Sequence, residues 1–231
     1  MVRIVKDYDE RRAEILATSQ QLFMTLGYEK TPISTILETL KISKGTFYHY
    51  FESKEELLEA IVANMVVQAQ QEASAILENP ALNSLQKLNL FFDRSKNMKL
   101  EYRDLMLSLM HMLYSDDNVR LRNKLYERQM AMVSPILAGF IEQGIQEGIF
   151  TCTDARVVAE SIVMFSNSVG ELLGKLMLEC IKDPSQLPAL ETRLRVYADA
   201  FMRILGAPPG SIELFDKKTV RRMLALPLET T

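Results

Sequence analysis

Apolar residues recur at three- and four-residue steps along almost the whole chain, and this spacing limits the fold more than any other feature. The 231 residues include only nine glycines and eight prolines, and alternating runs of β-branched residues are nearly absent. The pattern predicts an all-α protein whose amphipathic helices each bury one apolar stripe. A chain of this length can build a hydrophobic core without disulfides or a metal.

Charge and cysteine content narrow the class of protein. The formal net charge is -3, so any contact with nucleic acid must come from a local arrangement and not from a bulk positive field. Cys152 and Cys180 lack the spacing of a metal site, and we expect two small core residues in a cytoplasmic protein. The charged N-terminus does not resemble a signal peptide, and we expect no membrane span, no metal and no cofactor.

Cap residues divide the N-terminal part of the chain into short helices. Three are predicted at residues 9–26, 32–40 and 44–51, with Asp9 as the N-cap of the first and Gly27 as its end. Thr31 and Ser43 are the expected caps of the second and third. A fourth and longer helix, 54–78, should begin after Ser53 in a capping box completed by Glu56.

Later helices are expected at 84–99, 101–114, 119–146, 155–181 and 188–205, and the tail from Ser211 to Leu226 is compatible with one more. We divide the chain into an N-terminal domain of short helices at 1–53, a domain of longer helices at 54–210, and a C-terminal tail at 211–231.

Residues 31–54 carry the pattern of a helix-turn-helix, in which two very short capped helices are joined by a tight turn. Ile36, Phe47 and Phe51 are expected to face inward, so the third helix presents a short polar and aromatic side that could enter a major groove. Gly45 would let the helix backbone approach DNA closely. The candidate DNA contacts are Thr31, Ser34, Ser43, Lys44, Gly45, Thr46, Tyr48, His49, Tyr50 and Lys54, of which Lys44, Thr46, Tyr48 and His49 are the candidate base readers.

The stretch from Ile15 to Ile61 resembles the DNA-binding region of the TetR family of transcriptional regulators, and SKGTFYHYFESKEEL, from Ser43 to Leu57, is close to that family's most specific motif. The segment 144–150 also resembles the turn before the family's dimerising helices. The family often has a glycine where this chain has Lys41, and a left-handed Lys41 would cost roughly 1 kcal/mol more than glycine.

The resemblance implies a homodimer whose third helices enter successive major grooves of a palindromic operator. It also implies that an effector bound in the C-terminal domain shifts the fourth helix and moves the two DNA-binding heads apart. Repression, released by the effector, is the default activity of such a protein.

The chain after residue 61 is rich in methionine and aromatic residues, which suit either an adaptable effector pocket or ordinary core packing. A largely apolar small molecule is the expected effector. For His111, the alternative to an effector contact is a position in the core. For Asn167, it is a hydrogen bond in a subunit interface. The candidate effector contacts are Phe91, Tyr102, Met106, Met110, His111, Tyr114, Met130, Phe165 and Asn167.

The two long helices near the end of the chain carry apolar stripes, and small residues at 166, 170 and 174 would allow close helix approach. This favours a four-helix interface between two copies, with burial against the chain's own helices as the alternative. The candidate interface residues are Val158, Ile162, Ser166, Val169, Gly170, Leu173, Leu194, Tyr197 and Phe201.

We find no GxSxG, P-loop or HExxH motif and only two histidines, so the sequence predicts no enzyme. Two functions remain. The first is a ligand-responsive DNA-binding transcriptional regulator, and the alternative is a helical ligand- or protein-binding module whose helix-turn-helix reads no specific DNA.

Overall fold

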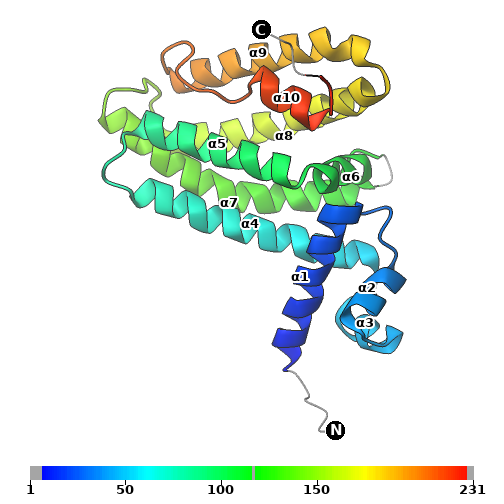
Figure 1. Ribbon diagram of the computed structural model, residues 1–231. Helices are drawn as coiled ribbons and strands as arrows, with labels where there is room; N and C mark the ends of the chain where they lie inside the picture. The colour runs from blue at the N-terminus through cyan, green and yellow to red at the C-terminus, as the bar shows by residue number, and fades with distance from the viewer. Residues whose placement is uncertain (1–6, 116–117, 228–231) are drawn as a thin grey trace. The chain divides into compact units, whose positions relative to one another are not determined.

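The computed structural model describes residues 7–115 and 118–227, and all regular secondary structure in these ranges is helical (Figure 1). Residues 1–6 of the charged N-terminal segment and the last four residues of the tail lie outside this description. The all-α prediction is confirmed. The helices are α1 (Tyr8–Leu26), α2 (Ile33–Leu40), α3 (Lys44–Tyr50), α4 (Lys54–Glu78), α5 (Ser84–Glu101), α6 (Arg103–Leu113), α7 (Val119–Gln146), α8 (Ala155–Lys182), α9 (Leu187–Leu205) and α10 (Lys217–Met223), with a 3₁₀ turn η2 (Pro184–Gln186) before α9.

Helix boundaries agree closely with the predicted ones except in the tail, where only α10 is helical. The caps differ at three places. At the start of α4 the Ser53 Oγ accepts from the Glu56 amide at 3.0 Å as predicted, but the Glu56 carboxylate accepts from the Glu52 amide and not from that of Ser53, so the capping box is incomplete. Asp7, not Asp9, caps α1, because its carboxylate accepts a hydrogen bond from the Tyr8 amide. Thr31 does not cap α2: the N-cap is Pro32, and the buried Thr31 hydroxyl instead donates to the Gly27 carbonyl at 2.8 Å.

The chain forms two compact units. The first, here the head unit, comprises described residues up to Gln68 together with Asp104–Ser108, and the second, the helical unit, comprises 69–103 and described residues from Leu109 onward. The predicted boundary after residue 53 falls at the start of α4, which is shared: its residues 54–68 belong to the head unit and 69–78 to the helical unit. Leu105, from α6, is a fully buried member of the head unit.

Large apolar side chains from successive helices fill the head unit. Ile15 and Phe23 of α1, Ile36 of α2 and Phe47 of α3 are completely buried. The α2–α3 turn passes through Lys41, whose φ of 53° and ψ of 43° lie in the left-handed region that favours glycine. The turn and the Ser43 cap together start α3 within a few residues of the end of α2.

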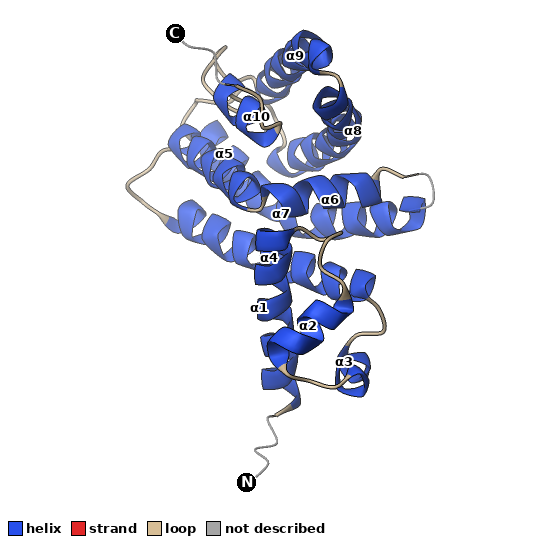
Figure 2. Cartoon of the chain, turned by 45° about the vertical axis from the view of Figure 1, so that its right-hand side comes forward, coloured by secondary structure: helices blue, strands red, loops and turns tan. Residues whose placement is uncertain are grey.

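In the helical unit, α7 packs against α5 and α8, α8 packs against α9, and α10 packs against α5 (Figure 2). One core joins the end of α4 to α5, α7, the first half of α8 and the end of α9, and includes Leu88, Phe140 and Phe201. A second core joins the second half of α8 to the first half of α9 and to α10, and includes Leu173 and Leu190. The tail packs on this second core through Val220 and Leu224, and this burial stabilises α10.

Among the described residues, α8 has the length and apolar composition that would suit a membrane span, although we expected no such run. One third of the apolar window is buried inside the subunit. Its exposed apolar side chains include Val157, Met164 and Leu172, which are 50%, 61% and 58% exposed. The helix is therefore apolar on two sides.

Interactions between distant segments fix the start of α5. Asn83 and Gln86 form a capping box there, and the Glu147 carboxylate at the end of α7 accepts a hydrogen bond from the Ser84 amide at 2.8 Å. The buried Lys87 ammonium donates to the Leu77 carbonyl at 2.6 Å and to the Gln143 side chain at 2.8 Å. Hydrogen bonding from Ser84 holds the pKa of Glu147 below its ordinary value.

We predict that Glu147→Gln destabilises the protein in a pH-dependent way. A carboxylate with a depressed pKa stabilises the fold above its ordinary pKa, and this contribution is lost as the pH falls through the folded-state pKa. Urea unfolding should give a loss of about 0.5–1 kcal/mol at neutral pH, as for a charge at a helix N-terminus, and no difference in acid. Glu142→Gln, on the same helix, is the control. A difference that did not change with pH would contradict the prediction.

We also predict that Lys41→Gly stabilises the head unit relative to Lys41→Ala. Both substitutions remove the ammonium, but only glycine is unstrained at a φ of 53°. The glycine variant should be more stable by about 1 kcal/mol in urea unfolding. Equal stability of the two variants would mean that this backbone conformation is unstrained.

Candidate functional site

The outward side of α3 is a short polar and aromatic surface. Lys44, Gly45, Tyr48 and His49 are exposed, and the Tyr48 side chain is 43% exposed. On the opposite side Phe47 is completely buried. The structure therefore brings most of the predicted DNA contacts together on one helix and leaves them accessible to a ligand.

Local hydrogen bonds fix the first turn of α3. The Ser43 Oγ accepts a hydrogen bond from the Thr46 amide at 3.0 Å, which is the predicted N-cap, and lies 2.8 Å from the Thr46 hydroxyl. The Lys44 ammonium lies 5.8 Å from the centre of the Tyr48 ring, one turn further along. Two candidate base readers are thus adjacent on the exposed side.

Gly45 leaves the surface of α3 open. A Cβ built at this residue would meet only the Ser43 Oγ, at 3.8 Å. The chain itself therefore does not require a glycine here for packing. This agrees with a requirement imposed by close approach of a partner to the helix backbone.

Two other predicted DNA contacts are engaged inside the head unit. The Lys54 ammonium donates to the Tyr28 carbonyl at 2.6 Å and lies 4.0 Å from the centre of the Tyr28 ring. Burial lowers the pKa of Lys54. Thr31 is completely buried, whereas Ser34 on α2 is exposed. Lys54 and Thr31 therefore hold the α1–α2 turn and the start of α4 in place.

Sequence reasoning missed a contribution from α1. The Tyr8 ring lies 4.7 Å from the Tyr50 ring and 5.7 Å from the His49 ring, measured between centroids. One turn further on, the Arg12 guanidinium lies over the Phe51 ring at 5.1 Å. The four-residue spacing of Tyr8 and Arg12 places them on one side of α1, but nothing in the sequence pairs that side with the end of α3.

Most of the predicted interface residues face the interior of the same subunit. Ile162 and Phe201 lie in the first core of the helical unit, and Val169, Leu173 and Leu194 lie in the second. Val158, Gly170 and Tyr197 are partly buried, and Ser166 is exposed. The exposed apolar side chains on these two helices are instead Val157, Met164, Leu172, Ile181 and Val196.

The nine predicted effector residues are dispersed. Phe91 and Met130 pack beside the first core, and Phe165 packs beside the second. Met106 belongs to the head unit, and His111 is exposed. The Tyr114 hydroxyl donates to the Gly170 carbonyl at 3.1 Å, and the Asn167 carbonyl accepts from Tyr126 at 3.4 Å. Tyr102 and Met110 are partly buried on α5–α6.

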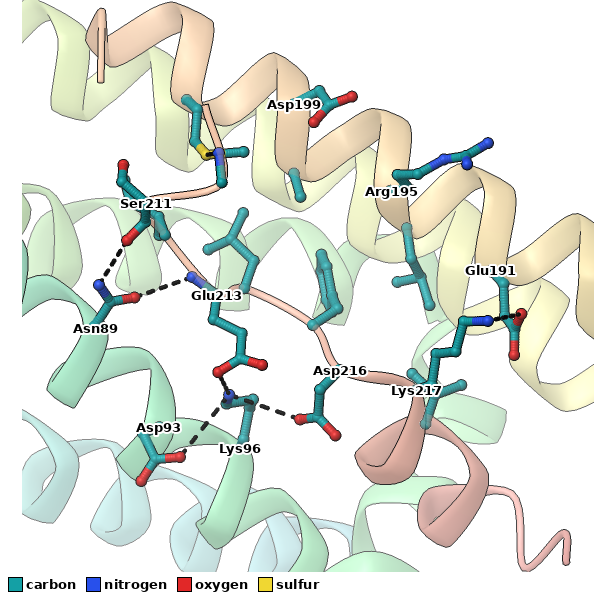
Figure 3. Close-up of a pocket in the computed structure, with 18 of the residues that line it drawn as sticks. Asn89, Asp93, Lys96, Glu191, Arg195, Asp199, Ser211, Glu213, Asp216 and Lys217 are labelled. Atoms are coloured by element: carbon teal, nitrogen blue, oxygen red, sulfur yellow. Dashed lines mark hydrogen bonds and ion pairs between the residues drawn. The ribbon is translucent and has the colours of Figure 1, made fainter. Parts of the chain in front are cut away.

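A groove of about 1230 Å³ lies elsewhere in the helical unit, between α5, α9 and the segment 210–217 (Figure 3). None of the nine predicted effector residues lines it. Its apolar lining includes Leu90, Met202 and Phe215, and its polar lining includes five carboxylates and three cations: Asp93, Glu191, Asp199, Glu213, Asp216, Lys96, Arg195 and Lys217.

Polar contacts hold the segment 210–217 across this groove (Figure 3). The Asn89 side chain donates to the Ser211 carbonyl at 2.8 Å and accepts from the Glu213 amide at 3.0 Å. The Lys96 ammonium lies 3.7–3.8 Å from carboxylates of Asp93, Glu213 and Asp216. A ligand in the groove would therefore contact the tail as well as two helices.

The cysteines and acidic residues form no further site among the described residues. Cys180 is completely buried and Cys152 is partly buried, and burial raises the pKa of both thiols. No cluster of three histidine, cysteine or acidic side chains in the described ranges is placed to hold a metal ion.

Comparison with known proteins gives one family. Residues 15–61 match the model of the bacterial regulatory proteins of the tetR family. The transcriptional repressor NemR of Escherichia coli is 28% identical over 88 residues, which are 38% of this chain and 44% of NemR. The transcriptional regulator EthR of Mycobacterium tuberculosis is 31% identical over 90 residues, or 37% of this chain and 42% of EthR. The matched region thus spans less than half the length of these curated relatives.

Solved structures resemble the fold over most of the chain. A TetR-family regulator from Pectobacterium atrosepticum superposes with a TM-score of 0.63 at 18% identity, covering 89% of this chain and all of the other. FadR of Thermus thermophilus, in complex with lauroyl-CoA, superposes with a TM-score of 0.55 at 19% identity, covering 82% of this chain and 94% of FadR. Residues 15–61 thus match the DNA-binding region of the tetR family, and the fold over most of the chain is similar to that of a solved TetR-family regulator.

Proposed function

We propose that this protein is a DNA-binding transcriptional regulator that binds a palindromic operator as a homodimer and releases it on binding a small molecule. The observation that supports this proposal most strongly is the exposed side of α3. Lys44, Tyr48 and His49 are exposed there, on a helix anchored by the buried Phe47. Because the relative NemR is a transcriptional repressor, repression is the proposed activity.

The contacts with DNA are assigned by side-chain chemistry. Lys44 can donate to the acceptor edge of guanine in the major groove, and the Tyr48 ring and hydroxyl suit a thymine methyl and a phosphate. The Thr46 hydroxyl is less available to contact a base, because it lies within hydrogen-bond distance of the Ser43 hydroxyl. Lys54 is assigned to positioning α4, since its ammonium already bonds the Tyr28 carbonyl.

The homodimer is proposed to form through the exposed apolar side of α8 together with α9. Val157, Met164 and Leu172 follow one another at helical spacing, and Val196 is 54% exposed on α9. A contiguous exposed apolar surface on a soluble protein favours burial against a partner. Two such helices from each copy would form a four-helix interface and bury the side of α8 that its own subunit leaves open. On this proposal the protein is cytoplasmic, and α8 does not enter a membrane.

The effector is proposed to bind in the groove between α5, α9 and the segment 210–217. The groove is large enough for a drug-sized ligand, and its lining combines apolar side chains with a charged rim. FadR holds lauroyl-CoA, a molecule with a long apolar chain, and we expect a largely apolar effector here too. Because α4 runs through both units, a shift of this helix can carry the effect of the ligand to the head unit.

The second candidate is a helical ligand- or protein-binding module that reads no specific DNA. Acidic side chains outnumber basic ones in the head unit, and this weakens general attraction to phosphate. The charge balance therefore favours a module of this kind. Selection of binding sites from random double-stranded DNA separates the two candidates. An enriched palindrome supports the regulator, and the absence of any enriched sequence supports the module.

We predict that Lys44→Ala and Tyr48→Ala each weaken binding to the selected operator while the fold is retained. Loss of a base contact should lower affinity by about ten- to a hundredfold. Electrophoretic mobility shift or fluorescence anisotropy measures the affinity, and circular dichroism checks the fold. Lys30→Ala, which removes an exposed lysine from the α1–α2 turn, is the matched control. Full affinity of both α3 variants would exclude this side of α3 as the reading surface.

We predict that Leu172→Asp combined with Met164→Asp yields a folded monomer. Both side chains are mostly exposed in the subunit, so the substitutions should leave its own cores intact while placing unpaired charges in the proposed interface. Analytical ultracentrifugation gives the oligomeric state. Val119→Asp, at an exposed apolar residue on α7, is the control and should remain dimeric. A dimer unchanged by the double substitution would place the interface elsewhere.

A further inference from the structure

We infer that Tyr8, in the first turn of α1, is a positioning residue for DNA recognition, because its ring holds those of His49 and Tyr50 at the end of α3. The inference rests on the proposed function and adds a residue that lies outside the helix-turn-helix. Tyr8 acts through its two aromatic neighbours and not through a DNA contact of its own.

Three rings form a closed cluster. The Tyr8 and Tyr50 rings are tilted by 35° at a centroid distance of 4.7 Å, and the Tyr8 and His49 rings meet edge to face at 5.7 Å and 85°. His49 and Tyr50 complete the cluster at 5.1 Å and 80°. Each pair lies within the range in which aromatic rings attract one another beyond simple burial.

The cluster is surface-exposed, which separates it from ordinary core packing. Tyr8 is 48% exposed, His49 is exposed and Tyr50 is partly buried. Phe47 and Phe51 lie almost fully buried in the core, whereas Tyr8 remains half-exposed. The ring contacts therefore contribute little burial and mainly restrict the orientations of two side chains on the proposed DNA-binding surface.

Two further contacts hold the first turns of α1 in place. The Asp7 carboxylate accepts the Tyr8 amide at 2.6 Å as the N-cap of α1. One turn along α1, the Arg12 guanidinium lies over the Phe51 ring at 5.1 Å, which is a second contact between α1 and the end of α3. Helix α1 thus begins against the last turn of α3, and Tyr8 is the first side chain of that contact.

Ordering of the rings before binding matters because α3 is only seven residues long. Side chains at the end of so short a helix would otherwise lose rotamer freedom when they meet DNA, and this loss lowers affinity. The Tyr8 ring removes part of that freedom in the unbound protein. His49 and Tyr50 are the residues through which its effect must pass.

The binding test compares Tyr8→Ala with Tyr8→Phe on the selected operator. Tyr8→Ala should weaken binding by about two- to tenfold, the range to which aromatic pair energies convert, and Tyr8→Phe should bind as the wild type does. The double variant Tyr8→Ala, Tyr50→Ala should bind the operator only slightly more weakly than Tyr50→Ala alone. Equal loss in Tyr8→Phe, full affinity of Tyr8→Ala, or additive losses in the double variant would each overturn the positioning role.

A second measurement needs no DNA. The chain has only two histidines, so the imidazole C–H resonances of His49 and His111 can be resolved by proton NMR and assigned with His111→Gln. Tyr8→Ala should shift the His49 resonances, through the lost ring current, and leave those of His111 unchanged. Unchanged His49 resonances would overturn the inferred cluster even if DNA binding were normal.

The two measurements keep the inference and the proposed function distinguishable. A shifted His49 with a twofold or larger loss of operator affinity supports both. Failure of the wild-type protein to select any DNA would overturn the proposed function, and with it the role of Tyr8, while the NMR result would still report on the cluster. Normal operator binding by Tyr8→Ala would overturn the inference alone.

Discussion

Burial of the Phe47 side chain is the interaction on which the proposed recognition surface depends. A helix of seven residues is not stable by itself in water, because too few hydrogen bonds offset the cost of its first turn. Complete burial of Phe47 contributes about 1.5–3 kcal/mol and fixes the rotation of α3 about its axis. With Phe47 inward, Tyr48 and His49 point outward, since one and two residues further along a helix turn the side chain by about 100° and 200°. Lys44, the first residue of the helix, is exposed as well. The Ser43 cap then fixes where the helix begins.

The two sides of α8 show how far periodicity alone can lead. Residues such as Ile162 and Leu173 form an apolar stripe that the sequence reveals clearly, and the structure buries it inside the subunit. Met164 and Leu172, on the other side, remain exposed. Because α8 also carries apolar residues outside this stripe, spacing could identify an apolar helix but not which side its own subunit covers. Only the packing of α8 on α7 and α9 decides this.

Features determined by short stretches of sequence were predictable, and features determined by long-range contacts were not. The Ser43 cap follows from a few neighbouring residues, and that prediction is confirmed. The groove in the helical unit depends on Asn89 meeting Ser211, which is 122 residues away, and no local pattern indicates that pairing. The same limit explains Lys54, whose position after Ser53 indicates a helix start but not the Tyr28 carbonyl that its ammonium reaches.

Charge explains why preordered side chains and two linked heads would matter in this protein. Acidic residues outnumber basic ones in the head unit, and the Lys54 ammonium already bonds the Tyr28 carbonyl, so on the proposed function general attraction to phosphate would be weak. On that proposal, affinity would come from base-edge contacts, from side chains that lose little freedom on binding, and from two heads held by one dimer. The last contribution grows with effective concentration and disappears when the head spacing no longer matches the operator. A regulator with weak general attraction to DNA is therefore especially sensitive to any ligand that changes that spacing, because little non-specific affinity remains to hold it on the operator.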